Sequence, residues 1–134
     1  MIVVDSSAWI EALRGTRSGA DLTFQRLLHE EAPVATTEAV VGEVLAGARD
    51  ELDHVRLRRR LLALRFVSVR GFDGFERAAR LSQHCRGLGF TPGLADSLVA
   101  AAALATGAAV LHADAHFDAI AAVTDLECYP LDAA

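Results

Sequence analysis

The sequence predicts an α/β fold with a mostly parallel sheet, built as one domain over residues 1–134. Short runs of apolar, β-branched residues alternate with longer segments of helical periodicity, the pattern of parallel strands joined by helices. The length of 134 residues fits one hydrophobic core. A hydrophobic content of 52% against 23% charged residues excludes an intrinsically disordered chain.

The predicted strands are the short apolar runs. They lie at 2–4, 34–35, 66–69, 109–111 and, as a closing strand or tail, 126–131. Valine, isoleucine and phenylalanine dominate the first four, as is typical of strands buried within a sheet.

Helices are predicted between these strands from capping residues and apolar spacing. Ser6 is a plausible N-cap of the first helix, which should end at Gly15, and Thr36 or Thr37 is a plausible N-cap of the third. The expected helices extend from Ser6 to residue 12 or 13, and over about 20–31, 37–47, 50–64, 72–86, 94–106 and 117–123.

Charge and cysteine usage narrow the possible functions. A net charge of −5 argues against nucleic-acid binding by bulk electrostatics, so any such role must be local. All 13 basic residues are arginine, which excludes mechanisms that need a lysine amine. Cys85 and Cys128 form no CxxC pair, and no signal peptide or membrane span is expected, so the sequence predicts reduced thiols in a cytoplasmic protein.

Two acidic residues follow predicted strands. Asp5 comes directly after the run at 2–4, and Asp114 follows the run at 109–111 by a few residues. Ligands of open α/β sheets bind at the carboxyl ends of the strands, so both positions are candidates for a site. The alternative for Asp5 is that it begins a turn or caps the next helix.

Two further acids lie within predicted helices. Glu43 has only uncharged, mostly apolar neighbours for four residues on either side, so we expect a buried carboxylate with a metal ion or a buried donor, unless the helix turns this edge to solvent. Asp96 opens an apolar helix, where the free N–H groups would also stabilise a purely structural carboxylate.

The four acids predict a divalent metal site, because carboxylates cannot converge without a neutralising charge. Mg²⁺ or Mn²⁺ prefers oxygen ligands, and such ions at a sheet edge typically serve phosphoryl chemistry. The segment with His112, Asp114, His116 and Asp118 offers a weaker alternative, a zinc site of mixed ligands.

The four acidic segments resemble those of the PIN-domain ribonucleases, and within them the VapC-type toxins of bacterial type II toxin–antitoxin pairs. The resemblance spans nearly the whole chain, and the order and spacing of the segments are more specific than any one of them. They are IVVDSSAWIE at 2–11, TEAVVGEVLAG at 37–47, ADSLVAAAA at 95–103 and LHADAHF at 111–117.

The resemblance implies a three-layer α/β/α PIN-like fold, a Mg²⁺- or Mn²⁺-dependent endoribonuclease and a cognate antitoxin protein that blocks the site. The family's metal-site acids correspond to Asp5, Glu43, Asp96 and Asp114, with Asp5 and Asp96 expected to bind the principal ion. Ser6 and Ser7 are expected to support these ligands. His116 stands where many relatives carry another acid, and it would contact phosphate or the antitoxin instead.

Other expectations concern partners and rival functions. A homodimer is expected because the apolar content exceeds what one small domain buries readily. Arg56, Arg59 and Arg60 lie on a basic helix face that would guide RNA, contact the antitoxin or simply face solvent. The rival functions are a catalytically weak PIN-like binding module and a metal-dependent phosphatase, although the latter often needs a carboxylate where Ser7 stands.

Overall fold

A computed structural model describes residues 1–134, and its centre is a sheet of five strands in the order β3-β2-β1-β4-β5. Every pair of neighbouring strands is parallel, which confirms the predicted α/β class. The strands are β1 (Ile2–Val4), β2 (Val34–Thr36), β3 (Arg65–Phe66), β4 (Ala109–Leu111) and β5 (Glu127–Cys128).

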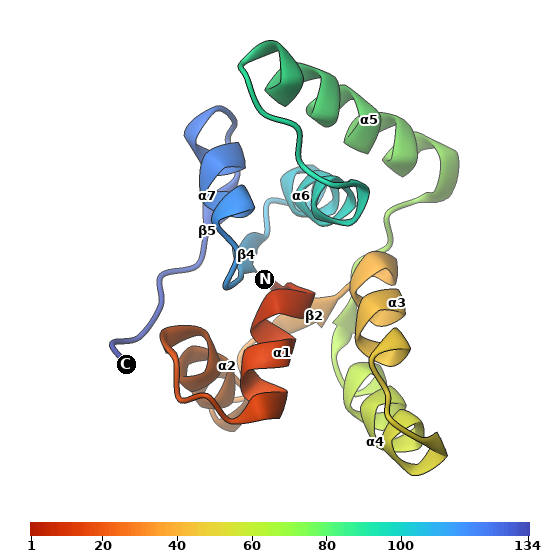
Figure 1. Ribbon diagram of the computed structural model, residues 1–134, viewed down its shortest axis with the longest axis vertical. Helices are drawn as coiled ribbons and strands as arrows, with labels where there is room; N and C mark the ends of the chain where they lie inside the picture. Colours follow the sequence, from red (N-terminus) through yellow and green to blue (C-terminus); the bar gives the residue numbers. More distant parts are fainter.

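Seven helices join and cover these strands. They are α1 (Ser6–Arg14), α2 (Gly19–His29), α3 (Glu38–Ala46), α4 (Glu51–Leu62), α5 (Gly71–Gly87), α6 (Leu94–Thr106) and α7 (Ala115–Ala122). In Figure 1, α1 and α2 lie on one side of the strands and α5 and α6 on the other, which gives the three layers expected from the resemblance. Helix α3 contacts α1 and α4 and also reaches α6. None of the seven helices combines the length and apolar composition that a membrane crossing requires.

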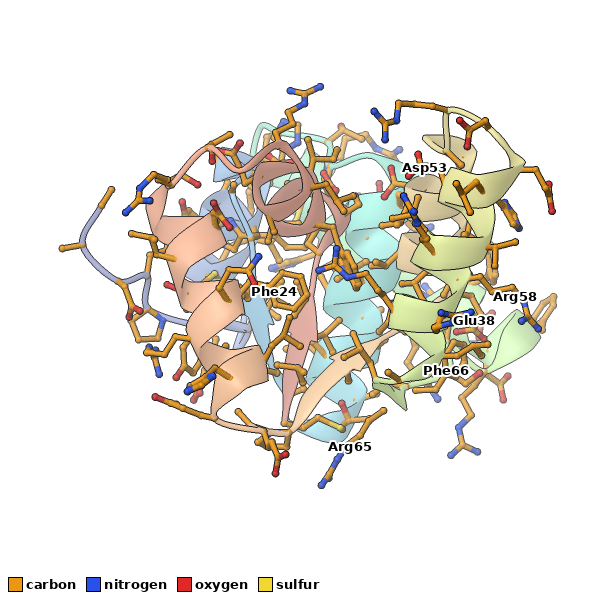
Figure 2. All side chains as sticks on the ribbon, turned by 90° about the horizontal axis from the view of Figure 1, so that it is seen from below. Phe24, Glu38, Asp53, Arg58, Arg65 and Phe66 are labelled. Carbon is orange, nitrogen blue, oxygen red and sulfur yellow. The ribbon has the colours of Figure 1, made fainter.

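The core forms where both helical layers meet the sheet. Val3, Val4 and Val110 are fully buried in the central strands β1 and β4. Trp9 of α1 packs edge-on against Phe24 of α2 with ring centroids 5.0 Å apart. Figure 2 shows Phe24 pointing inward from α2, and this packing fixes α1 on the sheet.

The register of the central strands brings three chain segments to one edge of the sheet. Val4 of β1 pairs with Leu111 of β4, and the backbone N–H of Asp5 donates to the carbonyl oxygen of Leu111 at 2.9 Å. Because parallel strands end at the same edge, the residues that come after β1, β2 and β4 lie close together there.

The third strand is shorter than the predicted 66–69. Arg65 and Phe66 pair with β2, and the N–H of Val67 donates to the carbonyl oxygen of Thr36 at 2.8 Å. Beyond Val67, the carboxylate of Glu38 accepts from the Ser68 hydroxyl at 2.7 Å and the Val69 N–H at 2.8 Å. Burial alone would raise the pKa of Glu38, but these hydrogen bonds hold that pKa below its usual value. Strand β3 is thus an exposed edge strand, from which Arg65 points away in Figure 2.

The end of α2 and a glycine in α5 show how the backbone limits the sequence locally. Helix α2 ends at His29, two residues before the predicted end, since the cap forms at Glu30 and Glu31 already has a positive φ of 55°. In α5, Gly74 lies directly under the carbonyl oxygen of Val69, and a Cβ atom added there would overlap that oxygen. This position therefore requires glycine for steric reasons.

Candidate metal centre

Asp5 lies at the end of β1 and caps α1. Its Oδ2 atom accepts from the backbone N–H of Ser7 at 3.0 Å and from the Ser7 hydroxyl at 2.6 Å. The prediction that Ser6 caps this helix is therefore wrong, because the helix begins one residue earlier than that cap would require. The other oxygen, Oδ1, is buried and has no hydrogen-bond partner.

The surroundings of Asp5 disfavour an unneutralised charge. The residue is only 2% exposed, and burial raises the pKa of its carboxyl above the usual value, against the lowering effect of Ser7. Asp96 and Glu43 are near enough to raise this pKa further. A cation at the free Oδ1 atom would relieve both the desolvation and the repulsion.

Asp96 is the third residue of α6. The helix has Gly93 as its N-cap, with no side-chain cap. The Oδ2 atom of Asp96 lies 3.1 Å from Nδ1 of His116. Burial raises the pKa of Asp96, the hydrogen bond from His116 lowers it, and the nearby carboxylates of Asp114 and Glu43 raise it. Asp96 is therefore half-buried among like charges, with one imidazole as its protein partner.

Asp114 caps α7. Its Oδ1 atom accepts from the backbone N–H of His116 at 2.9 Å and lies 3.5 Å from the Nδ1 atom of the same residue. Donor atoms of Asp96, Asp114 and His116 all lie within 4.8 Å of one another, which is close enough for one ion. The N-terminus of α7 thus contributes two of these three donors.

Glu43 differs from its expected environment. The sequence predicts a buried carboxylate, but α3 turns this residue to solvent, and its neighbours Val40 and Val44 fill the core instead. Its Oε1 atom still accepts from the Ser6 hydroxyl at 2.8 Å. Ser6 therefore keeps the exposed carboxylate of Glu43 at the edge where Asp5 lies.

Two side chains hold the loop between β4 and α7 in place. The Ser7 hydroxyl, which donates to Asp5, also accepts from the backbone N–H of Ala113 at 2.9 Å. His112 accepts from the backbone N–H of Asp114 at its Nδ1 atom, at 3.1 Å. A supporting role for Ser7 is expected from the resemblance, whereas nothing in the sequence singles out His112 as a support for Asp114.

The residues of the alternative zinc site divide into two groups. The side chains of Asp114 and His116 lie close to Asp96. Those of His112 and Asp118 lie close to Cys128 instead. Because Nδ1 of His112 accepts a hydrogen bond, its neutral ring carries the proton on Nε2, which faces Asp118 at 3.3 Å. A metal-bound histidine normally donates from its second nitrogen, so His112 does not fit a metal ligand.

Arginines lie on α4 and around a hollow next to Glu43. Arg56, Arg59 and Arg60 are exposed on α4, and the guanidinium of Arg60 stacks 5.3 Å above the ring of Trp9. A hollow of about 450 Å³ between α1, α3 and α4 reaches Glu43, one of the four acids. Its lining residues are Ser6, Ile10, Leu13, Arg14, Glu43, Val44, Gly47, Arg49, Asp53 and Leu57.

Comparison with known proteins identifies similar chains. The sequence profile of the PIN domain matches residues 2–123. Ribonuclease VapC11 of Mycobacterium tuberculosis is 40% identical over 129 residues, which cover 95% of this chain and 96% of that protein.

Solved structures of similar fold come from more distant sequences. VapBC2 from Rickettsia felis, bound to a DNA fragment from its promoter, includes a chain with a TM-score of 0.77 and 18% identity, covering 98% of this chain and all of that one. VapC20 of M. tuberculosis, described as a sarcin–ricin loop cleaving toxin, has a TM-score of 0.70 and 23% identity, covering 95% and 99% of the two chains.

Proposed function

Because this chain belongs to the PIN domain family, we propose that it is a divalent-metal-dependent endoribonuclease and the toxin of a type II toxin–antitoxin pair. The nuclease activity is supported by 40% identity to a VapC ribonuclease along nearly its whole length. We also propose that residues 1–134 act as one PIN domain, since the buried residues form a single core cluster.

One observation carries the metal-dependent part of this proposal. The Oδ1 atom of Asp5 is buried, lacks a partner and lies among other carboxylates. A buried acceptor without a donor costs free energy unless something binds it, and a cation suits a site of like negative charges. The residues present therefore fit a divalent ion.

We assign the ion to the carboxylates of Asp5, Glu43, Asp96 and Asp114, with Asp5 and Asp96 as the principal ligands. All four supply the hard oxygen donors that Mg²⁺ and Mn²⁺ prefer. When bound, such an ion lowers the pKa of a water and offsets the negative charge that develops during phosphodiester hydrolysis.

The remaining residues of the centre position these ligands. The Ser7 hydroxyl donates a hydrogen bond to Oδ2 of Asp5, which leaves Oδ1 as the oxygen free to bind the ion. Ser6 holds Glu43, and His112 holds the backbone of Asp114. No side-chain nucleophile is needed, because the attacking group is water.

The hollow beside the acids supports the assignment of partners. Arg14 and Glu43 line it, and Arg49 lines it while paired with Asp53 at 3.3 Å, so a phosphate backbone entering there would meet the positive charge of Arg14 near the proposed ligand Glu43. Ile10 and Leu13 give the same hollow an apolar wall, which suits a segment of the antitoxin that competes with RNA. Arg56, Arg59 and Arg60 remain candidates for longer-range RNA guidance.

We also propose a homodimer. Phe72 is 81% exposed and Phe75 is 47% exposed, and their spacing of three residues puts both on one face of α5. Large exposed aromatic side chains on one face are typical of protein interfaces. Sedimentation at micromolar concentration should give a dimer, and only monomer would disprove it.

The nuclease function is tested with the purified protein and a structured RNA. Cleavage should occur with Mn²⁺ or Mg²⁺, stop on addition of EDTA and fall by about a thousandfold in Asp96→Asn, which keeps the shape of the side chain and removes its charge. Asp125→Asn, at an exposed position away from the centre, serves as the matched control. Cleavage that is insensitive to EDTA, or that survives in Asp96→Asn, would refute the proposal.

A further inference from the structure

The imidazole of His116 lies among the acidic side chains of the proposed metal site. Its Nδ1 atom is 3.1 Å from Oδ2 of Asp96 and 3.5 Å from Oδ1 of Asp114. The His116 side chain is 61% exposed, so it faces the solvent from which an ion would enter. Among the three side chains of this group that could bind one ion, His116 is the one that offers a nitrogen atom.

The distances match those between ligands of one ion. Two adjacent donor atoms bound at about 2.1 Å in octahedral geometry lie about 3 Å apart. The spacings of Nδ1 from Asp96 and from Asp114 are close to that value. The backbone of His116 is also fixed, because its N–H lies in the first turn of α7 and donates to the capping carboxylate of Asp114 at 2.9 Å.

The hydrogen bonds of the ring permit coordination through Nδ1. In the ion-free protein Nδ1 of His116 donates its proton to Oδ2 of Asp96. The Nε2 atom has no protein partner, so the proton of the neutral ring is carried there when an ion takes the Nδ1 lone pair. His112 lacks this freedom, since its Nδ1 atom already accepts from the backbone of Asp114. The two histidines of this segment therefore have different roles.

We infer that Nδ1 of His116 is itself a ligand of the divalent ion, together with Asp96 and Asp114, and that it makes the site prefer Mn²⁺ or Co²⁺ over Mg²⁺. Imidazole nitrogen binds first-row transition ions well and Mg²⁺ poorly, whereas a site of carboxylates alone suits Mg²⁺. This inference rests on the proposed metal-dependent function but is separable from it, because the carboxylates would bind an ion without His116.

Calorimetric titration of the purified protein with Mg²⁺, Mn²⁺ and Co²⁺ tests the preference. In His116→Asp, which replaces nitrogen by oxygen, the ratio of Mn²⁺ affinity to Mg²⁺ affinity should fall by about tenfold, and the Co²⁺ to Mg²⁺ ratio by more. His116→Ala should lower the Mn²⁺ affinity with little effect on Mg²⁺. The matched control is His29→Asn, at an exposed histidine on α2.

Pulsed electron paramagnetic resonance of the Mn²⁺-loaded protein gives a direct readout of the ligand. A nitrogen coupling should be present in the native protein and in His29→Asn, and lost in His116→Asp and His116→Ala. Since the native protein alone is enough to detect the coupling, the test does not depend on the folding of any variant.

The outcomes separate this inference from the proposed function. RNA cleavage in Mn²⁺ without a nitrogen coupling, or an unchanged Mn²⁺ to Mg²⁺ ratio in His116→Asp, would overturn the role of His116 and leave the nuclease intact. A native protein that binds none of the three ions at millimolar concentration would overturn both.

Discussion

Mn²⁺ should raise the melting temperature of this protein, and Asp5→Asn should remove that effect. The buried carboxylate of Asp5 has one oxygen without a partner and lies near Asp96 and Glu43. The fold buries this carboxylate and brings the other two near it, whereas the unfolded chain does not, so the ion binds the native state in preference to the unfolded chain.

The size of the effect depends on the binding equilibrium and the chain length. At a hundredfold excess of Mn²⁺ over its Kd, binding to the native state adds about 2.7 kcal/mol to the free energy of unfolding. For a chain of 134 residues, the usual entropy of unfolding converts this into a rise of about 10 °C in Tm.

The raised pKa of Asp5 also decides whether Asp5→Asn raises or lowers the stability of the metal-free protein. A carboxyl whose pKa is higher in the folded state than in the unfolded state costs stability at pH values above the folded-state pKa. The cost shrinks as the pH falls below that value and is gone below the unfolded-state pKa. At pH 7, Asp5→Asn removes this cost and keeps an N-cap, because asparagine caps helices as well as aspartate does. The metal-free variant should therefore melt at or above the temperature of the metal-free native protein.

Differential scanning calorimetry at pH 7, with EDTA or with millimolar Mn²⁺, measures all of these temperatures. Asp125→Asn, the exposed control, should keep the full shift. A native Tm indifferent to millimolar Mn²⁺ would refute the reasoning and favour a metal-free binding module. An Asp5→Asn variant that retains the shift would mean that the ion binds elsewhere.

Three further predictions concern the residues that support the site. Ser7→Ala removes the hydroxyl that donates to Asp5, and should lower the free energy of unfolding by about 2 kcal/mol in urea denaturation and weaken Mn²⁺ binding in calorimetry. Gly74→Ala places a methyl group on the carbonyl oxygen of Val69, and should destabilise by about 3 kcal/mol or more in the same urea assay. The hydrogen bonds that lower the pKa of Glu38 stabilise the fold above the usual carboxyl pKa, and this contribution is lost as the pH falls through the lowered value. Between about pH 5 and about pH 3, the native protein should therefore lose more stability than Glu38→Gln, as measured by urea denaturation across that range.

Each of these variants has a control or a contrary outcome. Ser82→Ala, at a serine without a hydrogen-bonded side chain, should leave Mn²⁺ binding unchanged. Gly42→Ala, in a helix with open space around the added methyl group, should be neutral or stabilising. A Gly74→Ala variant as stable as Gly42→Ala would show that α5 shifts freely. Parallel pH profiles for the native protein and Glu38→Gln would contradict the role of Glu38.

The sequence allows prediction of the sheet and of the edge where the acids gather. Strands β1 and β4 are apolar runs with polar residues directly after them, and parallel strands place their C-terminal neighbours at one edge. The pattern locates Asp5 and Asp114, because their positions depend only on strand direction and a short connection.

Other features depend on packing that a linear pattern does not specify. Uncharged neighbours surround Glu43 in sequence, but the face of α3 that reaches the core is set by its contacts with α1 and α6, and that face holds Val40 and Val44. The support of Asp114 by His112 requires a loop conformation that turns a ring nitrogen back to the chain. The end of β3 depends on Glu38, thirty residues earlier in the sequence than its partner Ser68.

At the two capping aspartates of the acidic centre, a single-base mutation can remove the charge and keep the helix cap. Asp5 caps α1 and Asp114 caps α7, and asparagine is an equally good N-cap at both positions. Aspartate and asparagine codons differ by a single base. One nucleotide change at either position therefore abolishes the negative charge while the helix still begins at the same residue. Under selection against a harmful activity, such alleles would encode folded proteins of full length that lack one charge of the acidic centre.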